Sequence, residues 1–318
     1  MMRTRRGREA ANGTPTGSSD CSTAKGVLDQ RALPDPDFEG LWEAIIVDQD
    51  LKDRLLGQAI LNFTVRPRLA RSTVPLHGVI LLVGEPGTGK TSLARALSSR
   101  TAGALKALGD FQYLEVEPHA LASSSLGKSQ QAVHHLLGTT IAEAAQAGPL
   151  IVVLDEVETL AADRTRLSLE ANPVDVHRAT DAVLAQLDHL ADECPNILFI
   201  ATSNFPAAID QAFVSRADLI VTVDLPGPQA AERILRDTVA AMSDAFPKLK
   251  HLPDDSALTK AAKLCQGLDG RRIRKVVLSA LAQSKQTALD PSRLTAPDIV
   301  RAAELAAAEA RPNRKEGT

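Results

Sequence analysis

The chain has 318 residues, of which 44% are hydrophobic, and it carries a formal net charge of −3 at pH 7. This length and hydrophobic content are sufficient for a sizeable buried core. The slightly acidic balance argues against a dedicated nucleic-acid-binding protein, which is usually basic. Nucleic acid is therefore not an expected partner.

Cysteine usage and hydropathy predict a cytoplasmic protein without membrane contact. Cys21, Cys194 and Cys265 are odd in number and far apart in the sequence, a pattern typical of free thiols in a reducing compartment. No apolar stretch approaches membrane-spanning length, and no signal-peptide apolar region follows the first residues.

Residues 1–32 are predicted to form a disordered basic tail. Arg3, Arg5, Arg6 and Arg8 precede a stretch that is rich in Gly, Ser, Thr and Pro and poor in hydrophobic residues. Such a segment cannot repay the conformational entropy lost on ordering. A transit peptide is the alternative interpretation, but the segment lacks the amphipathic apolar stripe that a transit peptide requires.

Residues 33–227 show alternating strand and helix patterns, which predict an α/β subdomain with a parallel sheet covered on both faces. The strand candidates are 79–83, 111–117, 150–155, 197–203 and 219–225. The helix candidates of this region are 48–64, 90–102, 128–147 and 176–192.

The most informative motif is GEPGTGKT at 84–91, which lies between the apolar run 79–83 and a helix-like segment. A strand, a glycine-rich turn, Lys-Thr and a helix together are typical of a loop that binds nucleotide phosphates. Lys90 is expected to reach the β- and γ-phosphates, and the hydroxyl of Thr91 to ligate Mg²⁺. The predicted nucleotide-binding residues are Gly84, Glu85, Pro86, Gly87, Thr88, Gly89, Lys90, Thr91 and Ser92.

An acidic pair follows the apolar run 151–154. A buried parallel strand delivers the residues after it to the carboxyl edge of the sheet, where ligands bind. Asp155 is expected to hold Mg²⁺ and Glu156 to polarise the attacking water. The pair favours ATP hydrolysis over a GTPase switch, which usually lacks the second acid.

Two further candidates follow the strand pattern 197–203. Asn204 would orient the attacking water or contact the γ-phosphate, although asparagine after a strand is often only a turn former. Arg216, in IDQAFVSRAD, fits an arginine finger that reaches the nucleotide of a neighbouring subunit. An exposed arginine on a solvated surface is the alternative for this residue.

Pro226-Gly227-Pro228 ends the strand–helix alternation, and residues 228–311 are predicted to form a helical lid. Residues 225–228 are its predicted hinge, and residues 312–318 a frayed tail. The helical patterns of the lid are 228–244, 255–266, 270–286 and 295–310.

The order of these motifs resembles that of the AAA+ ATPases, and more narrowly that of the pachytene-checkpoint group, which remodels HORMA-domain proteins. The narrower resemblance covers roughly residues 33–285. It depends on FEGLWEAIIVDQDLKDRLL at 38–56, VVLDEVETLAADR at 152–164, ATSNFPAAIDQAFVSRADL at 201–219 and GLDGRRIRK at 267–275.

The resemblance implies an AAA+ domain with a five-stranded parallel sheet of order 5-1-4-3-2, ATP and Mg²⁺ as cofactors, and a homo-hexameric ring. It implies that Arg271 senses the γ-phosphate, with a basic helical face made by Arg271, Arg272, Arg274 and Lys275 as the alternative. It places the adenine pocket near residues 45–53. The short form is similar to bacterial relatives found beside HORMA proteins and cyclic-oligonucleotide synthases in anti-phage defence.

The sequence departs from the group in two places. Residues 1–32 are too few for the adaptor-binding domain that precedes the ATPase core in eukaryotic members. The segment 119–128, which matches the first pore loop, has no aromatic residue to grip a threaded chain. Leu121 and Leu126 are its only large apolar residues, and the resemblance implies that they contact the substrate.

Two other functions remain open at this point. Nucleotide binding could hold a scaffold together, with hydrolysis serving only to reset this assembly switch. A clamp loader or DNA-remodelling ATPase is the third candidate, which the acidic balance disfavours. Stimulation of ATP turnover by a HORMA protein or by DNA would distinguish them.

Overall fold

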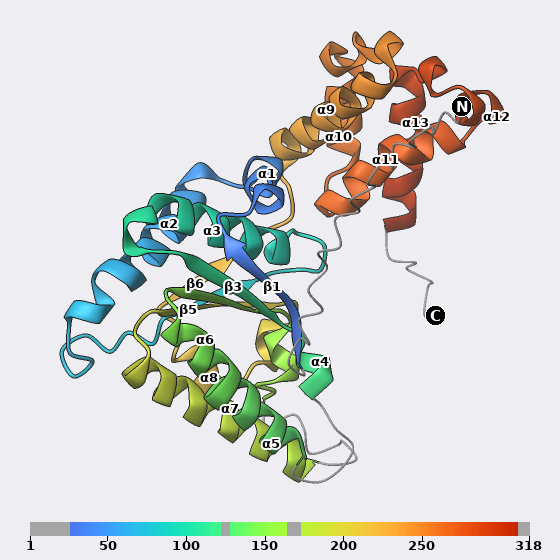
Figure 1. The fold of residues 1–318 in the computed structure, drawn as a ribbon. Coiled ribbons are helices and arrows are strands. Elements are labelled where there is room, and N and C mark those ends of the chain that lie inside the picture. Colours follow the sequence, from blue (N-terminus) through green and yellow to red (C-terminus); the bar gives the residue numbers. More distant parts are fainter. Residues whose placement is uncertain (1–25, 122–127, 164–172, 311–318) are drawn as a thin grey trace, which may run out of the picture.

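A six-stranded sheet forms the centre of the first subdomain (Figure 1). The computed structural model describes residues 26–121, 128–163 and 173–310. The strand order is β1-β3-β4-β5-β2-β6. The strands are β1 (Val27–Leu33), β2 (Val79–Val83), β3 (Phe111–Val116), β4 (Leu150–Leu154), β5 (Ile197–Ser203) and β6 (Leu219–Thr222).

The expectation of a five-stranded sheet is wrong in the number of strands. The five expected strands pair in parallel and lie in the order β6-β2-β5-β4-β3. A further strand, β1, pairs antiparallel with β3 and extends the sheet at that edge. The six-stranded sheet therefore differs from the expected five-stranded 5-1-4-3-2 arrangement.

Strand β1 also corrects the predicted boundary of the N-terminal tail. Residues 27–32, expected in the disordered segment, form most of this strand. Every second side chain from Val27 is half-buried, and Arg31 Nε donates to Asp29 Oδ2 at 2.6 Å. The strand was missed because its inward side carries a charged pair, which lowers the hydrophobicity of the segment.

The inner strands β2, β4 and β5 are buried along their whole length. Such continuous burial requires helices on both faces of the sheet. Helices α1, α2 and α3 cover one face, and α5 to α8 the other (Figure 1). These helices are α1 (Pro36–Ala44), α2 (Gln49–Thr64), α3 (Lys90–Ala104), α5 (Lys128–His135), α6 (Ala142–Gln146), α7 (Pro173–Glu193) and α8 (Gln211–Val214), with the short α4 (Pro118–Leu121) before α5.

The C-terminal region forms a helical subdomain with its own hydrophobic core. It contains five α-helices in the described residues rather than the expected four, because the predicted helix 270–286 ends early. Ser284 caps a new helix by accepting from the backbone N–H groups of Gln286 and Thr287. The helices are α9 (Pro228–Ala245), α10 (Ala257–Leu264), α11 (Gly270–Ala282), α12 (Lys285–Leu289) and α13 (Ala296–Ala310).

Candidate functional site

The glycine-rich segment forms a tight loop between β2 and the first turn of α3. Gly84, Gly87 and Gly89 have φ angles of 153°, 82° and 97°, which side-chain-bearing residues rarely adopt. A Cβ atom at Gly84 would lie 2.3 Å from the carbonyl oxygen of Val223, so this position has no room for a side chain. Successive backbone N–H groups in loops of this kind bind phosphate oxygens.

Lys90 begins α3 and is only 5% exposed. Its Nζ donates to the carbonyl oxygens of Gly84 and Glu85 at 2.9 and 2.8 Å. Burial lowers the pKa of Lys90, against the opposing attraction of the nearby carboxylates. The loop itself therefore holds this ammonium group in position to bind an anion.

Asp155 follows β4 and accepts two hydrogen bonds from hydroxyl groups on other elements. Thr91 Oγ1 donates to Asp155 Oδ1 at 2.7 Å, and Thr202 Oγ1 donates to the same oxygen at 2.5 Å. The register of β4 against β5, with Leu154 opposite Ala201, brings Thr202 beside Asp155. The sequence alone did not identify Thr202 as a site residue, because a threonine inside a strand pattern is typical of any strand.

Glu156 has a φ of 52° and is the only residue other than glycine with a positive φ in the described part of the chain. Strained backbone of this kind persists where surrounding contacts enforce it, and it is concentrated at functional sites. Glu156 N donates to Thr202 Oγ1 at 3.1 Å, and Asn204 Nδ2 donates to Glu156 Oε1 at 3.0 Å. Asn204 N donates in turn to Glu158 Oε1, a contact that the sequence did not predict.

One cavity of about 500 Å³ is lined by Lys90, Thr91, Asp155, Glu156 and Asn204, and the lid closes one side of it. Gly87 of the loop lies against Asp269, the residue that caps α11 by accepting from the N–H groups of Arg271 and Arg272. Arg271 lines the cavity, but so do Arg274 and Lys275, so position alone does not distinguish the three cations. The residues from the large subdomain are Pro86, Gly87, Gly89, Lys90, Thr91, Ser92, Asp155, Glu156 and Asn204.

A second cavity of about 270 Å³ lies between α1, the glycine-rich loop and the lid. Ile45, Ile46 and Pro226 supply apolar surface, and Thr88 lines it from the loop. Thr88 Oγ1 donates to the carbonyl oxygen of Glu85. An apolar cavity beside a phosphate loop has the character of a base pocket, and it contains the start of the segment 45–53 in which the adenine was expected.

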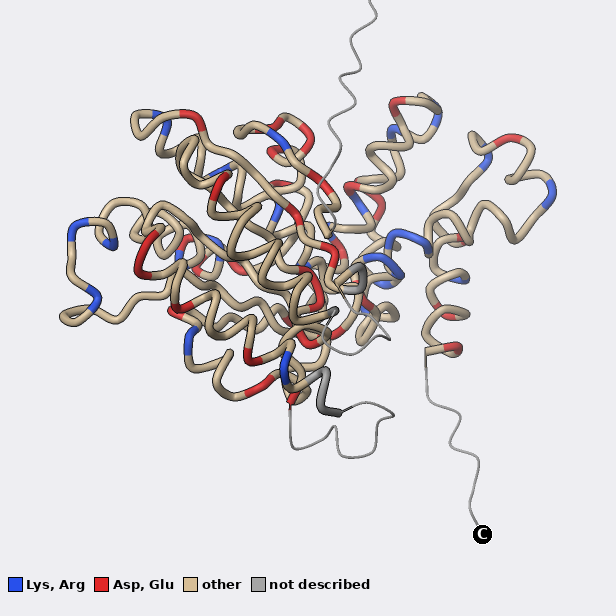
Figure 2. The backbone as a smooth tube through the Cα atoms, turned by 60° about the horizontal axis from the view of Figure 1, so that its bottom comes forward, with Lys and Arg blue, Asp and Glu red and all other residues tan. Residues whose placement is uncertain are grey.

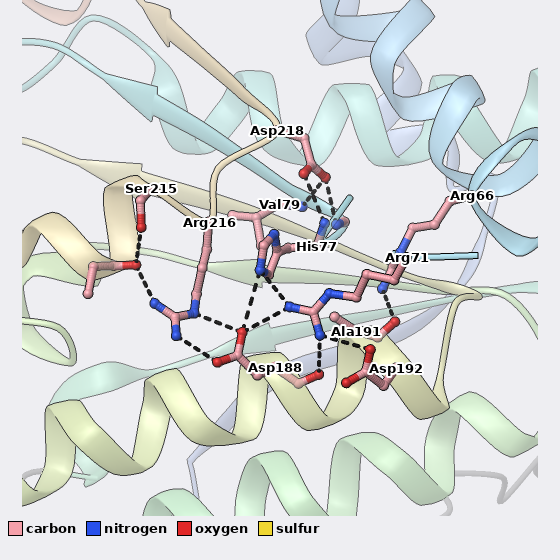
Figure 3. A network of polar contacts seen from close by, with 12 residues as sticks. Arg66, Arg71, His77, Val79, Asp188, Ala191, Asp192, Ser215, Arg216 and Asp218 are labelled. Atoms are coloured by element: carbon pink, nitrogen blue, oxygen red, sulfur yellow. Dashed lines mark hydrogen bonds and ion pairs between the residues drawn. The ribbon is translucent and has the colours of Figure 1, made fainter. Parts of the chain in front are cut away.

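Arg216 does not line the cavity of its own protomer. Its Nε and Nη2 donate to Asp188 at 2.9 and 2.6 Å (Figure 3). The structure therefore separates Arg216 from the other predicted catalytic residues.

The expectation that Leu121 grips a substrate is corrected by its burial. Leu121 is the last residue of α4, and its side chain is 3% exposed. It belongs to the hydrophobic core between the sheet and helices α5 and α7. A residue that completes a core cannot at the same time contact a threaded peptide. Leu126 lies outside the described residues.

The donor set fits a magnesium–nucleotide complex. The Thr91 hydroxyl and the Asp155 carboxylate are hard oxygen ligands, and the Lys90 ammonium lies in the same cavity. No group of three or more His, Cys, Asp and Glu side chains that could hold a metal occurs in the described ranges. Mg²⁺ beside phosphates commonly binds through one or two protein ligands and several waters.

The fold and the cavity together define a nucleotide-binding P-loop module with a helical lid. The family model for the ATPase family associated with various cellular activities (AAA) matches residues 80–225. CD-NTase-associated protein 6 of Pseudomonas aeruginosa is 55% identical over 282 residues, which cover 89% of this chain and 92% of that protein. The pachytene checkpoint protein 2 homolog of Arabidopsis thaliana is 35% identical, and the match covers 82% of this chain and 62% of that protein.

The chain belongs to the AAA ATPase family, in the group that contains CD-NTase-associated protein 6 and pachytene checkpoint protein 2. One chain in the solved structure of the E. coli MS115-1 HORMA:CdnC:Trip13 complex has the same fold. That chain is 18% identical with a TM-score of 0.70, and the match covers 88% of this chain and 95% of the other. No helix in the described ranges is long and apolar enough to cross a membrane.

Proposed function

We propose that this AAA ATPase couples ATP hydrolysis to the opening or disassembly of HORMA-domain protein complexes. The observation that carries the proposal is the shared cavity in which the glycine-rich loop, Asp155, Glu156, Asn204 and Arg271 of the lid come together. A site that combines a phosphate cradle, an acidic pair and a cation carried by the lid can connect the state of a nucleotide to the position of that lid.

In this proposal Lys90 binds the β- and γ-phosphates, while Thr91 and Asp155 hold Mg²⁺. When bound, the ion would neutralise charge that develops on the phosphates. Glu156 accepts a proton from the attacking water as a general base, and the hydrogen bond from Asn204 orients its carboxylate. Arg271 contacts the γ-phosphate from the lid, so its contact is lost when that phosphate leaves.

The proposed catalytic unit is a homo-hexamer in which Arg216 of one protomer contacts the nucleotide of the next. The absence of Arg216 from the cavity lining of its own protomer supports a role across a subunit interface. An arginine supplied in this way stabilises the charge of the transition state, so hydrolysis depends on assembly. Residues 225–228, between β6 and α9, are the proposed hinge for the lid.

The proposed partner is a HORMA-domain protein. The similarity to CD-NTase-associated protein 6 and to a chain of the HORMA:CdnC:Trip13 complex supports a place in a cyclic-oligonucleotide anti-phage system. Figure 2 shows acidic and basic residues interspersed over the molecule, a distribution that does not favour DNA as the substrate. Leu126, outside the described residues, stays the proposed substrate contact of the first pore loop.

ATP turnover in the presence of each candidate partner tests the proposal. We expect a HORMA-domain protein from the same organism to raise turnover, and double-stranded DNA to leave it unchanged. The matched control is Lys90→Ala, which removes the phosphate-binding ammonium group and should abolish both basal and stimulated turnover. Stimulation by DNA alone would support a DNA-remodelling ATPase, and no stimulation by either would support an assembly switch.

A further inference from the structure

A network of charged residues surrounds Arg216, three residues before the edge strand β6 (Figure 3). All three guanidinium nitrogens of Arg216 are engaged within the protomer. Nε and Nη2 form a two-pronged contact with the carboxylate of Asp188 on α7, and Nη1 donates to the carbonyl oxygen of Ala212 at 2.6 Å. This fork geometry fixes the plane of the guanidinium as well as its position.

Asp188 is held on its other side by a second arginine. Arg71 Nη2 lies 3.1 Å from Asp188 Oδ1, and Arg71 Nη1 donates to the backbone carbonyl oxygen of the same residue at 3.2 Å. His77 Nε2 lies 3.4 Å from Asp188 Oδ1, and Asp192 accepts from Arg71 one turn further along α7. The carboxylate is thus shared by two guanidinium groups and cannot rotate without breaking contacts to both.

The backbone beside Arg216 is anchored as well. Asp218, two residues further on, accepts hydrogen bonds from the backbone N–H groups of His77, Gly78 and Val79 at 2.9, 2.6 and 3.1 Å. These groups lie at the start of β2, the strand that leads into the glycine-rich loop. The segment that carries Arg216 is therefore fixed to the nucleotide-binding strand of its own protomer.

We infer that Asp188 is a positioning residue that presents the guanidinium of Arg216 to the nucleotide of a neighbouring protomer. This inference rests on the proposed role of Arg216 as an arginine that acts across the subunit interface. A long, flexible side chain loses rotamer freedom when it binds, and a pre-ordered one has lost that freedom already. Asp188 pairs with both Arg71 and Arg216. Its single negative charge therefore orients Arg216 but does not cancel the positive charge of that side chain.

Asp188→Asn tests the inference, with Asp192→Asn as the matched control. Asparagine keeps the size of the side chain but replaces one acceptor oxygen with an amide that cannot accept from Arg216. We expect maximal ATP turnover to fall by ~10-fold or more, while the Kd for ATP is unchanged, because the variant's own nucleotide cavity is intact. Asp192 contacts Arg71 but not Arg216, so Asp192→Asn should keep turnover close to that of the unmodified protein.

Subunit mixing separates positioning from a general loss of structure. Asp188→Asn protomers have an intact nucleotide site, and Lys90→Ala protomers have an intact Arg216. Mixed rings should therefore regain turnover at interfaces where the Lys90→Ala protomer supplies Arg216 to the Asp188→Asn protomer.

If Asp188→Asn alone turns over ATP at the unmodified rate or faster while Arg216→Ala is inactive, the inference is wrong but the role of Arg216 stands. Failure of mixed rings to regain activity, with subunit exchange confirmed, would mean that Asp188 is only structural. Full activity of Arg216→Ala would overturn both proposals.

Discussion

The side-chain amide of Asn204 donates a hydrogen bond of 3.0 Å to the carboxylate of Glu156. The two residues follow neighbouring parallel strands, β5 and β4, and are brought together by the register of the sheet. The contact holds the carboxylate of Glu156 at the carboxyl edge of the sheet, in the same cavity as Lys90 and Thr91. It also gives the asparagine a specific task, since it orients the proposed base.

Replacement of Glu156 by Gln is expected to leave ATP binding intact and to reduce turnover by ~10²-fold or more. The amide oxygen of glutamine can still accept from Asn204, and Asp155 is unchanged, so only the proton-accepting group is lost. Nucleotide affinity by titration and turnover by phosphate release measure the two effects separately. Turnover near the unmodified rate would show that Glu156 is not the base.

Replacement of Thr202 by Val should impair hydrolysis although Thr202 was not predicted from the sequence. Its hydroxyl donates to Asp155 and accepts from the backbone N–H of Glu156, so one side chain orients both acids. We expect the Mg²⁺ concentration needed for half-maximal turnover to rise and turnover to fall by ~10-fold. Thr202→Ser keeps the hydroxyl and serves as the control. Equal activity of the valine and serine variants would show that the hydroxyl of Thr202 does not contribute to hydrolysis.

The Arg216→Ala variant is expected to bind ATP but to lose ~10³-fold or more in turnover, as for an arginine that acts in trans. Mixing it with Lys90→Ala protomers, which are inactive alone, should restore activity at some interfaces. The measurement is ATP turnover as a function of the mixing ratio, with subunit exchange confirmed by differently labelled protomers. If the mixture hydrolyses no ATP at any mixing ratio, Arg216 does not act across the subunit interface.

The pH dependence of stability tests the Arg216–Asp188 pair. Hydrogen bonding to Arg216 lowers the pKa of Asp188 below its usual 3.8. The carboxylate therefore contributes stability above that pH and loses the contribution as the pH falls through its folded-state value. Since the pair is partly exposed, we expect Asp188→Asn to cost about 1 kcal/mol or less at neutral pH, and the difference to vanish in acid.

His77 lies beside the same carboxylate, and burial lowers its pKa below 6.5. The comparison is therefore made with His77→Gln in both proteins, so that only the carboxyl group titrates differently. Urea unfolding from pH 7 down to a pH below the folded-state pKa of Asp188 gives the free energies, provided both proteins refold. A difference that grows as the pH falls would contradict the assignment.

Local patterns predicted the parts of the site that depend on neighbours in sequence. The glycine-rich loop, the acidic pair and Asn204 each follow an apolar strand, and parallel pairing necessarily brings such strand ends to one edge. Strand β1 was missed because the pairing of Asp29 with Arg31 makes a partly buried strand look polar. Its place in the sheet is set by β3, which lies far along the chain.

The contacts that could not be predicted all depend on tertiary pairing. Asp188 reads in the sequence as an ordinary helix-surface acid, and only the fold brings Arg71 and Arg216 to it. Leu121 was interpreted from its place in a pore-loop pattern, but the packing of α4 buries it. Arg271 lines the cavity from α11, yet the sequence could not show that Arg274 and Lys275 line the same cavity.

Release of a bound peptide from a closed HORMA-domain complex measures the central claim most directly. The complex is incubated with the protein and ATP, and free and complexed HORMA are separated on a sizing column. We predict release with the unmodified protein and ATP, and none with Glu156→Gln, which binds ATP without turnover. Equal release by Glu156→Gln, or no release by the unmodified protein while it hydrolyses ATP, would contradict the claim that hydrolysis drives remodelling.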